Sequence, residues 1–297
     1  YRERDWNSEV VPPLAEPGLD LHEGDVLLAV NGRPVKLPTC VFEPFGGTVG
    51  HATELLVGRT PDDPAPHIVT VTPIADDMSL RYAAWVRAKR EHVAQATGGR
   101  VGYVHIPTTN YNGFSHFAKD LMAQSQHEAL IVDDRFNRGG VVPDFFIRML
   151  SQRTWNYASN RDGKPWYIPD LGIDGPQCLL INSYSGSGGD LIADLYRQAK
   201  LGPLIGHTTG GNLVGTWRWP TLIDGGQLSV PDFGLYDTEG RWIGENHGVE
   251  PDIAVENAPE SEADGHDPQL ERAIEWTLEA LRQHPVQRPA TPPFKRP

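Results

Sequence analysis

The sequence predicts a two-part protein, in which a small β-rich unit precedes a larger α/β domain. The chain has 297 residues, which favours two domains over one. The apolar segment 25–30 runs into Asn31-Gly32, a pair that is typical of a tight β-hairpin turn. From about residue 100 onward, short apolar strands alternate with amphipathic helices, which is the pattern of a layered α/β fold.

Composition and charge exclude several classes of protein. Hydrophobic residues make up 39% of the chain and charged residues 22%, as in a globular protein with a real core. The net charge of −13 disfavours nucleic-acid or anionic-membrane partners, because both need a basic surface. No run of 18 apolar residues occurs, so we expect no membrane-spanning segment.

Cysteine usage points away from a metal site and from a disulfide framework. The only cysteines are Cys40 and Cys178, and neither belongs to a C-x-x-C pair. Cys178 lies in an apolar segment and is expected to be buried. We therefore expect no structural zinc site. The sequence opens on Tyr1 without an initiator Met and shows no signal peptide, so we expect a fragment of a longer chain.

The β-rich unit extends over about residues 9–74. Pro and Gly residues punctuate its start, and strands are expected at 25–30, from Val35, and at 67–73, where apolar and polar residues alternate. The segment 51–57 is ambiguous between strand and loop. A helix is expected at 79–95, between this unit and the next.

The α/β part predicts strands at 101–107, 129–134, 178–182 and 203–206, and helices at 112–125, 141–152 and 187–199. Residues 217–245 are rich in Trp, Gly and Asp and are expected to form hairpins. The Pro-rich tail is expected to be loosely held. These patterns divide the chain into residues 1–76, an N-terminally incomplete first domain, residues 77–285, a second domain, and residues 286–297, the tail.

Ser187 stands where an apolar strand runs through a Ser- and Gly-rich turn into an amphipathic helix. The free backbone N–H groups at a helix start favour developing negative charge, so we predict that Ser187 is a nucleophile. The alternative is a structural N-cap, for which Ser is a favoured residue. Ser185, not Gly, stands two residues before Ser187, which disfavours the G-x-S-x-G turn of α/β-hydrolases.

A second glycine turn, Gly139-Gly140, follows another predicted strand. In a layered α/β fold both turns open at the same strand-end edge. One backbone N–H from each turn, at Gly140 and Gly188, would then form an oxyanion hole for a tetrahedral acyl intermediate. Taken by itself, Gly139-Gly140 is better explained as a simple helix-start turn.

The N-terminal unit resembles the PDZ domains of bacterial and archaeal proteases. The resemblance rests on Leu-Ala-Glu-Pro-Gly at 14–18 and Glu-Gly-Asp-Val-Leu-Leu-Ala-Val-Asn-Gly-Arg-Pro-Val at 23–35. Such domains bind extended peptides by strand addition. A purely structural spacer is the alternative.

Four ordered motifs in the second part resemble the C-terminal processing peptidase superfamily, and more narrowly its tricorn protease branch. They lie at 137–140, 184–190, 206–211 and 245–252. The resemblance implies a PDZ-like domain followed by an α/β sandwich catalytic domain of the crotonase and processing-peptidase type. It further implies a cytoplasmic, homohexameric serine peptidase that degrades short oligopeptides without a cofactor.

The resemblance also assigns the base. The processing-peptidase branch activates its serine with a lysine, but Asn212 occupies that position here, and an amide is no base. The tricorn branch uses a histidine with a nearby glutamate, which Glu245 matches. None of the 11 histidines matches the family's catalytic one. We therefore expect the histidine to come from a segment upstream of this chain.

Two departures from the family leave the cleavage-site preference open. Gly188 stands where tricorn relatives commonly carry an acid, and Ser183 stands where they often carry Glu. The Gly188 departure and the missing histidine support a second hypothesis, a catalytically inactive, PDZ-containing relative that binds peptides as a scaffold. A crotonase-like acyl-CoA enzyme is a third, because it shares the fold and the paired backbone donors.

Overall fold

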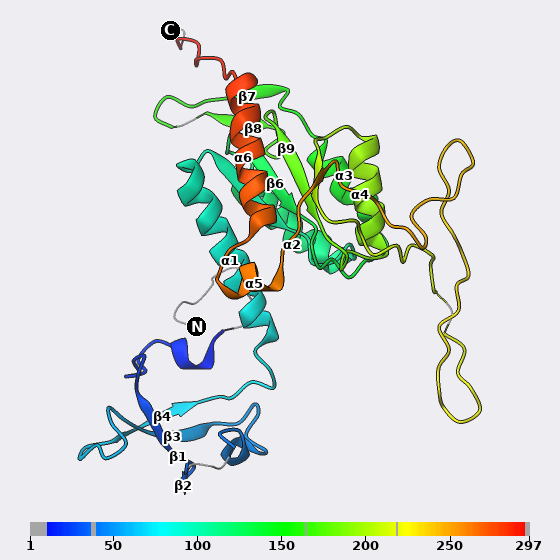
Figure 1. Cartoon of the computed structure of the whole chain (residues 1–297). Coiled ribbons are helices and arrows are strands. Elements are labelled where there is room, and N and C mark those ends of the chain that lie inside the picture. Colours follow the sequence, from blue (N-terminus) through cyan, green and yellow to red (C-terminus); the bar gives the residue numbers. More distant parts are fainter. Residues whose placement is uncertain (1–10, 37–39, 164, 218, 295–297) are drawn as a thin grey trace. The chain divides into compact units, whose positions relative to one another are not determined.

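The computed structural model describes residues 11–36, 40–163, 165–217 and 219–294 (Figure 1). The chain divides into two compact units, Tyr1–Ala88 and Lys89–Pro297. Helix α1 (Met78–Thr97) contains the boundary between them. Residues 1–10 and 37–39 of the predicted first domain, and 295–297 of the predicted tail, lie outside the described residues.

The first unit is built on an antiparallel sheet with strand order β2-β1-β3-β4. Asn31 and Gly32 both have positive φ, at 46° and 75°, which two-residue hairpin turns require. The ambiguous segment is strand β3, and its inward side chains Leu55 and Val57 pack with Val30 in the small core. The elements are η1 (Pro13–Ala15), β1 (Val26–Val30), β2 (Arg33–Pro34), η2 (Glu43–Phe45), β3 (Thr53–Gly58) and β4 (His67–Val71).

The second unit is built on a parallel sheet with strand order β11-β10-β9-β6-β5. Its central strands are buried on both faces, which explains their unbroken apolar sequences. The strands are β5 (Val101–His105), β6 (Ala129–Asp133), β9 (Gln177–Ile181), β10 (Leu204–Gly206) and β11 (Ile253–Ala254). The order places β6 and β9, the strands that precede the two predicted turns, side by side.

Helices cover both faces of this sheet and make the predicted sandwich. On one face, α2 (Tyr111–Gln124), α3 (Pro143–Leu150) and α4 (Gly188–Gln198) bury Phe117, Phe146 and Tyr196 in the main core. Helix α6 (Pro268–Gln283) packs against β6, β9 and β10 (Figure 1). It lies over Cys178, which is fully buried as predicted and contacts Thr277.

Sequence reasoning missed α6, although its start carries clear signals. Asp267 is the N-cap residue and accepts a hydrogen bond from the Leu270 N–H, and Pro268 occupies the first helical position. Also unpredicted are the hairpin of β7 (Asn156–Ala158) and β8 (Trp166–Ile168), strand β11, and the short helix α5 (Pro259–Ala263).

A buried ionic cluster ties α6 to the end of β6. Arg135, whose side chain is only 2% exposed, lies 2.7 Å from Asp133 and 2.8 Å from Asp267. Lys89 also contacts Asp267, at 2.6 Å. Burial opposes ionisation of Asp267, but the charges and hydrogen bonds of Arg135 and Lys89 outweigh it and hold the pKa of that carboxyl well below its usual range.

The predicted hairpins correspond to a long extended loop, residues 214–243, which we call the arm (Figure 1). Within its described residues the pairing is limited to three isolated antiparallel bridges, Gly215 with Phe233, Thr221 with Gln227, and Tyr236 with Trp242. Many of its apolar side chains are exposed.

Among the described residues, no helix of either unit is long and apolar enough to cross a membrane.

Candidate active site

Ser187 occupies a strained turn at the start of α4. Its φ of 55° and ψ of −113° lie in a region that non-glycine residues rarely adopt, at a cost of about 1–3 kcal/mol. The Asp190 carboxylate accepts a hydrogen bond from the Ser187 N–H at 2.8 Å, and the Ser187 carbonyl accepts one from Leu191 at 3.0 Å. The residue is half-buried. This turn thus holds the partly accessible Ser187 hydroxyl at the N-terminus of α4.

The Gly139-Gly140 turn lies directly against this serine. A Cβ built on Gly139 would lie 2.7 Å from the Ser187 Cβ and 3.0 Å from the Gly188 nitrogen, so no larger residue fits there. Gly139 and Gly140 also have φ of 82° and 150°, which favour glycine. The two turns that follow β6 and β9 therefore meet at one edge of the sheet, as the sequence predicts.

The backbone N–H groups of Gly140 and Gly188 have no hydrogen-bond acceptor among the described residues. Neither donates a hydrogen bond to any group in the described part of the chain. Gly188 is the first residue of α4, where an N–H has no acceptor within the helix. In a trans peptide the N–H points away from the carbonyl, and the Gly139 carbonyl is held by the Thr109 N–H at 2.9 Å. The Gly140 N–H is thereby directed away from Thr109.

Asn137 joins the two turns. Its carbonyl accepts a hydrogen bond from the Gly186 N–H at 3.0 Å, and its side-chain Oδ1 accepts one from the Gly139 N–H at 2.8 Å. Its Nδ2 donates to Asp134 Oδ1 at 2.7 Å. Asp134 is fully buried, and burial raises the pKa of its carboxyl well above its usual range.

Asp190 connects the serine turn to the loop at 209–212. Its Oδ1 accepts hydrogen bonds from the Thr209 hydroxyl at 2.5 Å and the Gly211 N–H at 2.8 Å. Its Oδ2 accepts from the Ser187 N–H and from the Asn212 N–H, the latter at 3.0 Å. Sequence reasoning gave Asp190 no role, although an acid three residues after a Ser N-cap is the pattern of a capping box.

Glu245 lies beyond that same loop. Its Oε2 accepts hydrogen bonds from the Leu213 and Val214 N–H groups, both at 2.7 Å. Asn246 donates its N–H to the Gly211 carbonyl at 2.8 Å, so the loop at 209–212 lies between Glu245 and the Ser187 turn. No described residue donates a hydrogen bond to Glu245 Oε1, which leaves that oxygen for another donor.

The histidines near this edge have other partners. His105 is buried, its ring nitrogen contacts the Arg135 carbonyl at 2.9 Å, and burial lowers its pKa. His207 and His247 are exposed, and each contacts the carbonyl of its own following residue at 3.1 Å. Within the described ranges, no histidine forms a hydrogen bond with Ser187.

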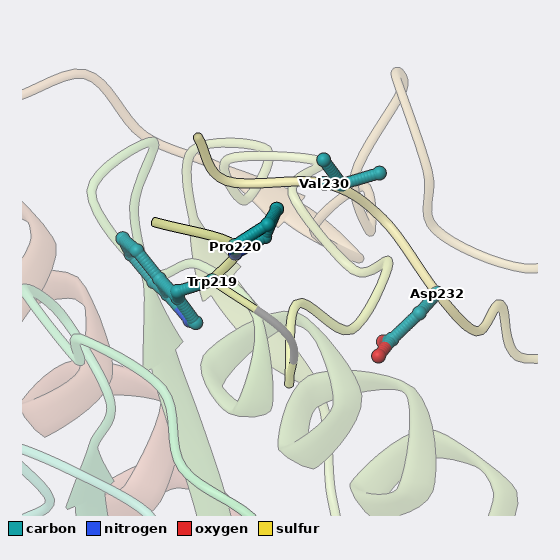
Figure 2. A pocket seen from close by; sticks show the side chains of 4 residues that line it. All are labelled: Trp219, Pro220, Val230 and Asp232. Atoms are coloured by element: carbon teal, nitrogen blue, oxygen red, sulfur yellow. The ribbon is translucent and has the colours of Figure 1, made fainter. Parts of the chain in front are cut away.

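A pocket in the arm, lined by Trp219, Pro220, Val230 and Asp232, contains none of the predicted site residues (Figure 2). Among its described lining residues Asp232 is the single titratable one, so these residues offer no pair of nucleophile and base. The meeting point of the two glycine turns is therefore the better candidate site.

Comparisons with known proteins match both units. The model of peptidase family S41 matches residues 100–255, and that of the tricorn protease PDZ domain matches residues 1–76. The chain is 35% identical over 281 residues to tricorn protease homolog 1 of Streptomyces coelicolor, covering 95% of this chain and 26% of that protein. It is 32% identical over 283 residues to the tricorn protease of Thermoplasma volcanium, covering 95% of this chain and 27% of that protein.

The crystal structure of the tricorn protease shows the same fold, with a TM-score of 0.83 and 31% sequence identity, over 91% of this chain and 26% of that chain. The chain therefore belongs to peptidase family S41, in its tricorn protease branch. It spans about a quarter of the length of these relatives.

Proposed function

We propose that this chain is the catalytic part of a serine peptidase that cleaves peptides through an acyl-enzyme at Ser187. The observation that carries the proposal is a pair of N–H groups, at Gly140 and Gly188, which have no acceptor among the described residues and lie on turns that meet beside the Ser187 side chain. Two such donors are what an oxyanion hole requires. The membership in peptidase family S41 supports the same reaction.

In this mechanism the Ser187 hydroxyl attacks the scissile carbonyl carbon while a histidine takes its proton. The carbonyl oxygen becomes an oxyanion that accepts hydrogen bonds from Gly140 and Gly188. The tetrahedral intermediate collapses, the C–N bond breaks, and the histidine gives its proton to the leaving amine. Water then hydrolyses the acyl-enzyme by the same route, which regenerates the serine.

We assign the base to a histidine upstream of residue 1, as in the tricorn branch. The free oxygen of Glu245 supports a role in orienting that histidine, because a carboxylate held by two backbone N–H groups presents its second oxygen in a fixed place. The same resemblance leads us to propose short oligopeptides as substrates, a homohexamer as the assembly, and the cytoplasm as the location.

The test is labelling of the intact, assembled protein with a fluorophosphonate, combined with an oligopeptide cleavage assay. Ser187→Ala is expected to abolish labelling and to lower kcat by about 10⁴-fold or more, because the nucleophile is lost. Ser183→Ala is the matched control, since Ser183 is an exposed serine on the same turn, and it is expected to label like the wild type.

Two outcomes would count against the proposal. Labelling and cleavage that persist in Ser187→Ala would place the chemistry elsewhere. A wild-type protein that neither labels nor cleaves would favour the inactive peptide-binding relative, and its PDZ-like unit would then be examined for peptide affinity.

A further inference from the structure

Thr109, in the loop between β5 and α2, carries a buried hydroxyl that has no hydrogen-bond partner in the described part of the chain. The residue is fully buried, and its Oγ1 has no hydrogen-bond partner among the described residues. Leaving a buried polar group unpaired costs about 1–3 kcal/mol. Threonine at this position therefore needs an explanation, since valine has the same shape without the cost.

The main chain of Thr109 brackets Gly140 on both sides. Its N–H donates to the Gly139 carbonyl and its own carbonyl accepts from the Val142 N–H, both at 2.9 Å. The first bond sets the direction of the peptide unit that contains the Gly140 N–H. Thr109 thus already determines the orientation of one proposed oxyanion donor.

The side chain of Thr109 faces the second donor. A Cβ built on Gly188 would lie 2.0 Å from Thr109 Oγ1, 2.6 Å from the Gly140 carbonyl oxygen and 2.8 Å from the Gly140 nitrogen. The hydroxyl therefore lies close to the backbone of both glycines. The same distances leave no room for a side chain at residue 188.

We propose that Thr109 is a positioning residue for acyl transfer at Ser187, an inference that rests on the proposed function. Its hydroxyl is held beside the Gly140 carbonyl and donates a hydrogen bond to that oxygen when the oxyanion forms. This bond fixes the peptide unit between Gly140 and Val141, and with it the backbone conformation of Gly140, so that the N–H groups of Gly140 and Gly188 converge on one point. Thr109 itself does not touch the substrate, because it is buried beneath the two turns.

The test compares Thr109→Val and Thr109→Ala with Thr109→Ser in the intact protein. The first two lose the hydroxyl and are expected to lower kcat about tenfold with an unchanged KM, because the donors matter most in the transition state. Thr109→Ser keeps the hydroxyl and is expected to stay within twofold of the wild type. Thr108→Val is the matched control, since Thr108 is the adjacent residue and its hydroxyl accepts a hydrogen bond from the Asn110 N–H.

Thermal melting separates positioning from a purely structural role. Removing an unpaired hydroxyl is expected to leave the melting temperature of Thr109→Val equal or higher, so a fall in kcat without a fall in stability supports the proposal. A kcat for Thr109→Val and Thr109→Ala within twofold of the wild type would overturn it.

Crystal structures of the fluorophosphonate adduct give a second readout. Thr109 Oγ1 is expected within hydrogen-bond distance of the Gly140 carbonyl in the wild-type adduct, and a separation beyond 3.5 Å would overturn the inference. If Ser187→Ala loses turnover while Thr109→Val keeps it, only the role of Thr109 fails. If Ser187→Ala keeps turnover, the proposed function fails and the role of Thr109 falls with it.

Discussion

Two neighbouring aspartates at the end of β6 are stabilised in opposite ways. Asp133 lies on the α6 side, where Arg135 balances its charge. Asp134 lies on the side of the serine turn and has no cation; its Oδ1 accepts from Asn137 and its Oδ2 has no partner among the described residues. Around Asp133 the ion pairs hold α6 in place. Around Asp134 and Asp190 the carboxyl groups accept hydrogen bonds from uncharged N–H and O–H groups, and at Asp190 these bonds orient backbone amides.

At this one edge of the sheet, contacts that stabilise the fold are therefore separate from contacts that shape the proposed site. A salt-bridged cluster tolerates no movement, because breaking it leaves a buried charge. Amides and hydroxyls around Asp190 and Asn137 instead fix peptide directions, which is what an oxyanion site needs. The predictions below change one side at a time.

The largest effect on stability is expected on the charged side. Arg135→Leu leaves Asp133 and Asp267 without their main cation, so the free energy of unfolding in urea is expected to fall by about 3–5 kcal/mol. Arg148→Leu is the control, because Arg148 is 74% exposed and its pair with Asp144 contributes about 0–1 kcal/mol. Equal losses in the two variants would remove the distinction drawn above.

Asp190→Asn tests the amide-orienting side. The amide replaces one acceptor oxygen with a donor that faces N–H groups, so we expect a loss of about 2–3 kcal/mol in unfolding free energy. Fluorophosphonate labelling of Ser187 is expected to slow at least tenfold, because the serine turn loses its anchor. Asp194→Asn on the same helix, where Asp194 accepts from Gln198, is expected to change neither. Wild-type labelling in Asp190→Asn would contradict the orienting role.

The smallest effect is a difference in pH dependence. Burial raises the pKa of Asp134, so its contribution to stability is greatest below the unfolded value of about 3.9 and is lost as pH rises toward the folded pKa, with a slope of up to about 1.4 kcal/mol per pH unit. The lowered pKa of Asp267 has the opposite sign, and its contribution is lost as pH falls below about 3.9.

Urea unfolding at pH 3 to 7 measures both signs. Asp134→Asn is expected to lose less stability than the wild type between pH 4 and 7. Asp267→Asn is expected to gain less than the wild type as pH rises from 3 toward 4. A wild-type profile in Asp134→Asn would mean that Asp134 is ionised in the folded protein.

The sequence predicts the sheet and its two turns because their signals are local. Apolar runs such as 129–133 and 177–181 identify buried parallel strands, and the glycines after them identify turns whose backbone must approach closely. The family resemblance supplied the roles predicted for Ser187 and Glu245, and the comparisons confirm the resemblance itself. Helix α6 was also predictable, since Asp267-Pro268 marks its start.

The role proposed for Thr109, and the hydrogen bonds of Asp190 to the loop at 209–212, depend on long-range contacts that no local pattern encodes. Thr109 meets Gly188 only because three strand-end loops converge after folding. The sequence does not indicate which of the adjacent residues Thr108 and Thr109 is the fully buried one. The arm is a different case, because the Trp-, Gly- and Asp-rich sequence of 217–245 predicted hairpins. The described residues form isolated bridges, since its exposed strands have no sheet to join.

The two hydrogen bonds from Leu213 and Val214 to Glu245 close the arm at its stem, just before residue 215 and just after residue 243. A loop closed in this way adds only about 0.6 kcal/mol of entropy cost when its length doubles. Insertions, deletions and sequence drift between 215 and 243 are therefore absorbed beyond the stem and leave Ser187 in place. A change in the length of the arm is therefore expected to leave the proposed site at Ser187 unaltered.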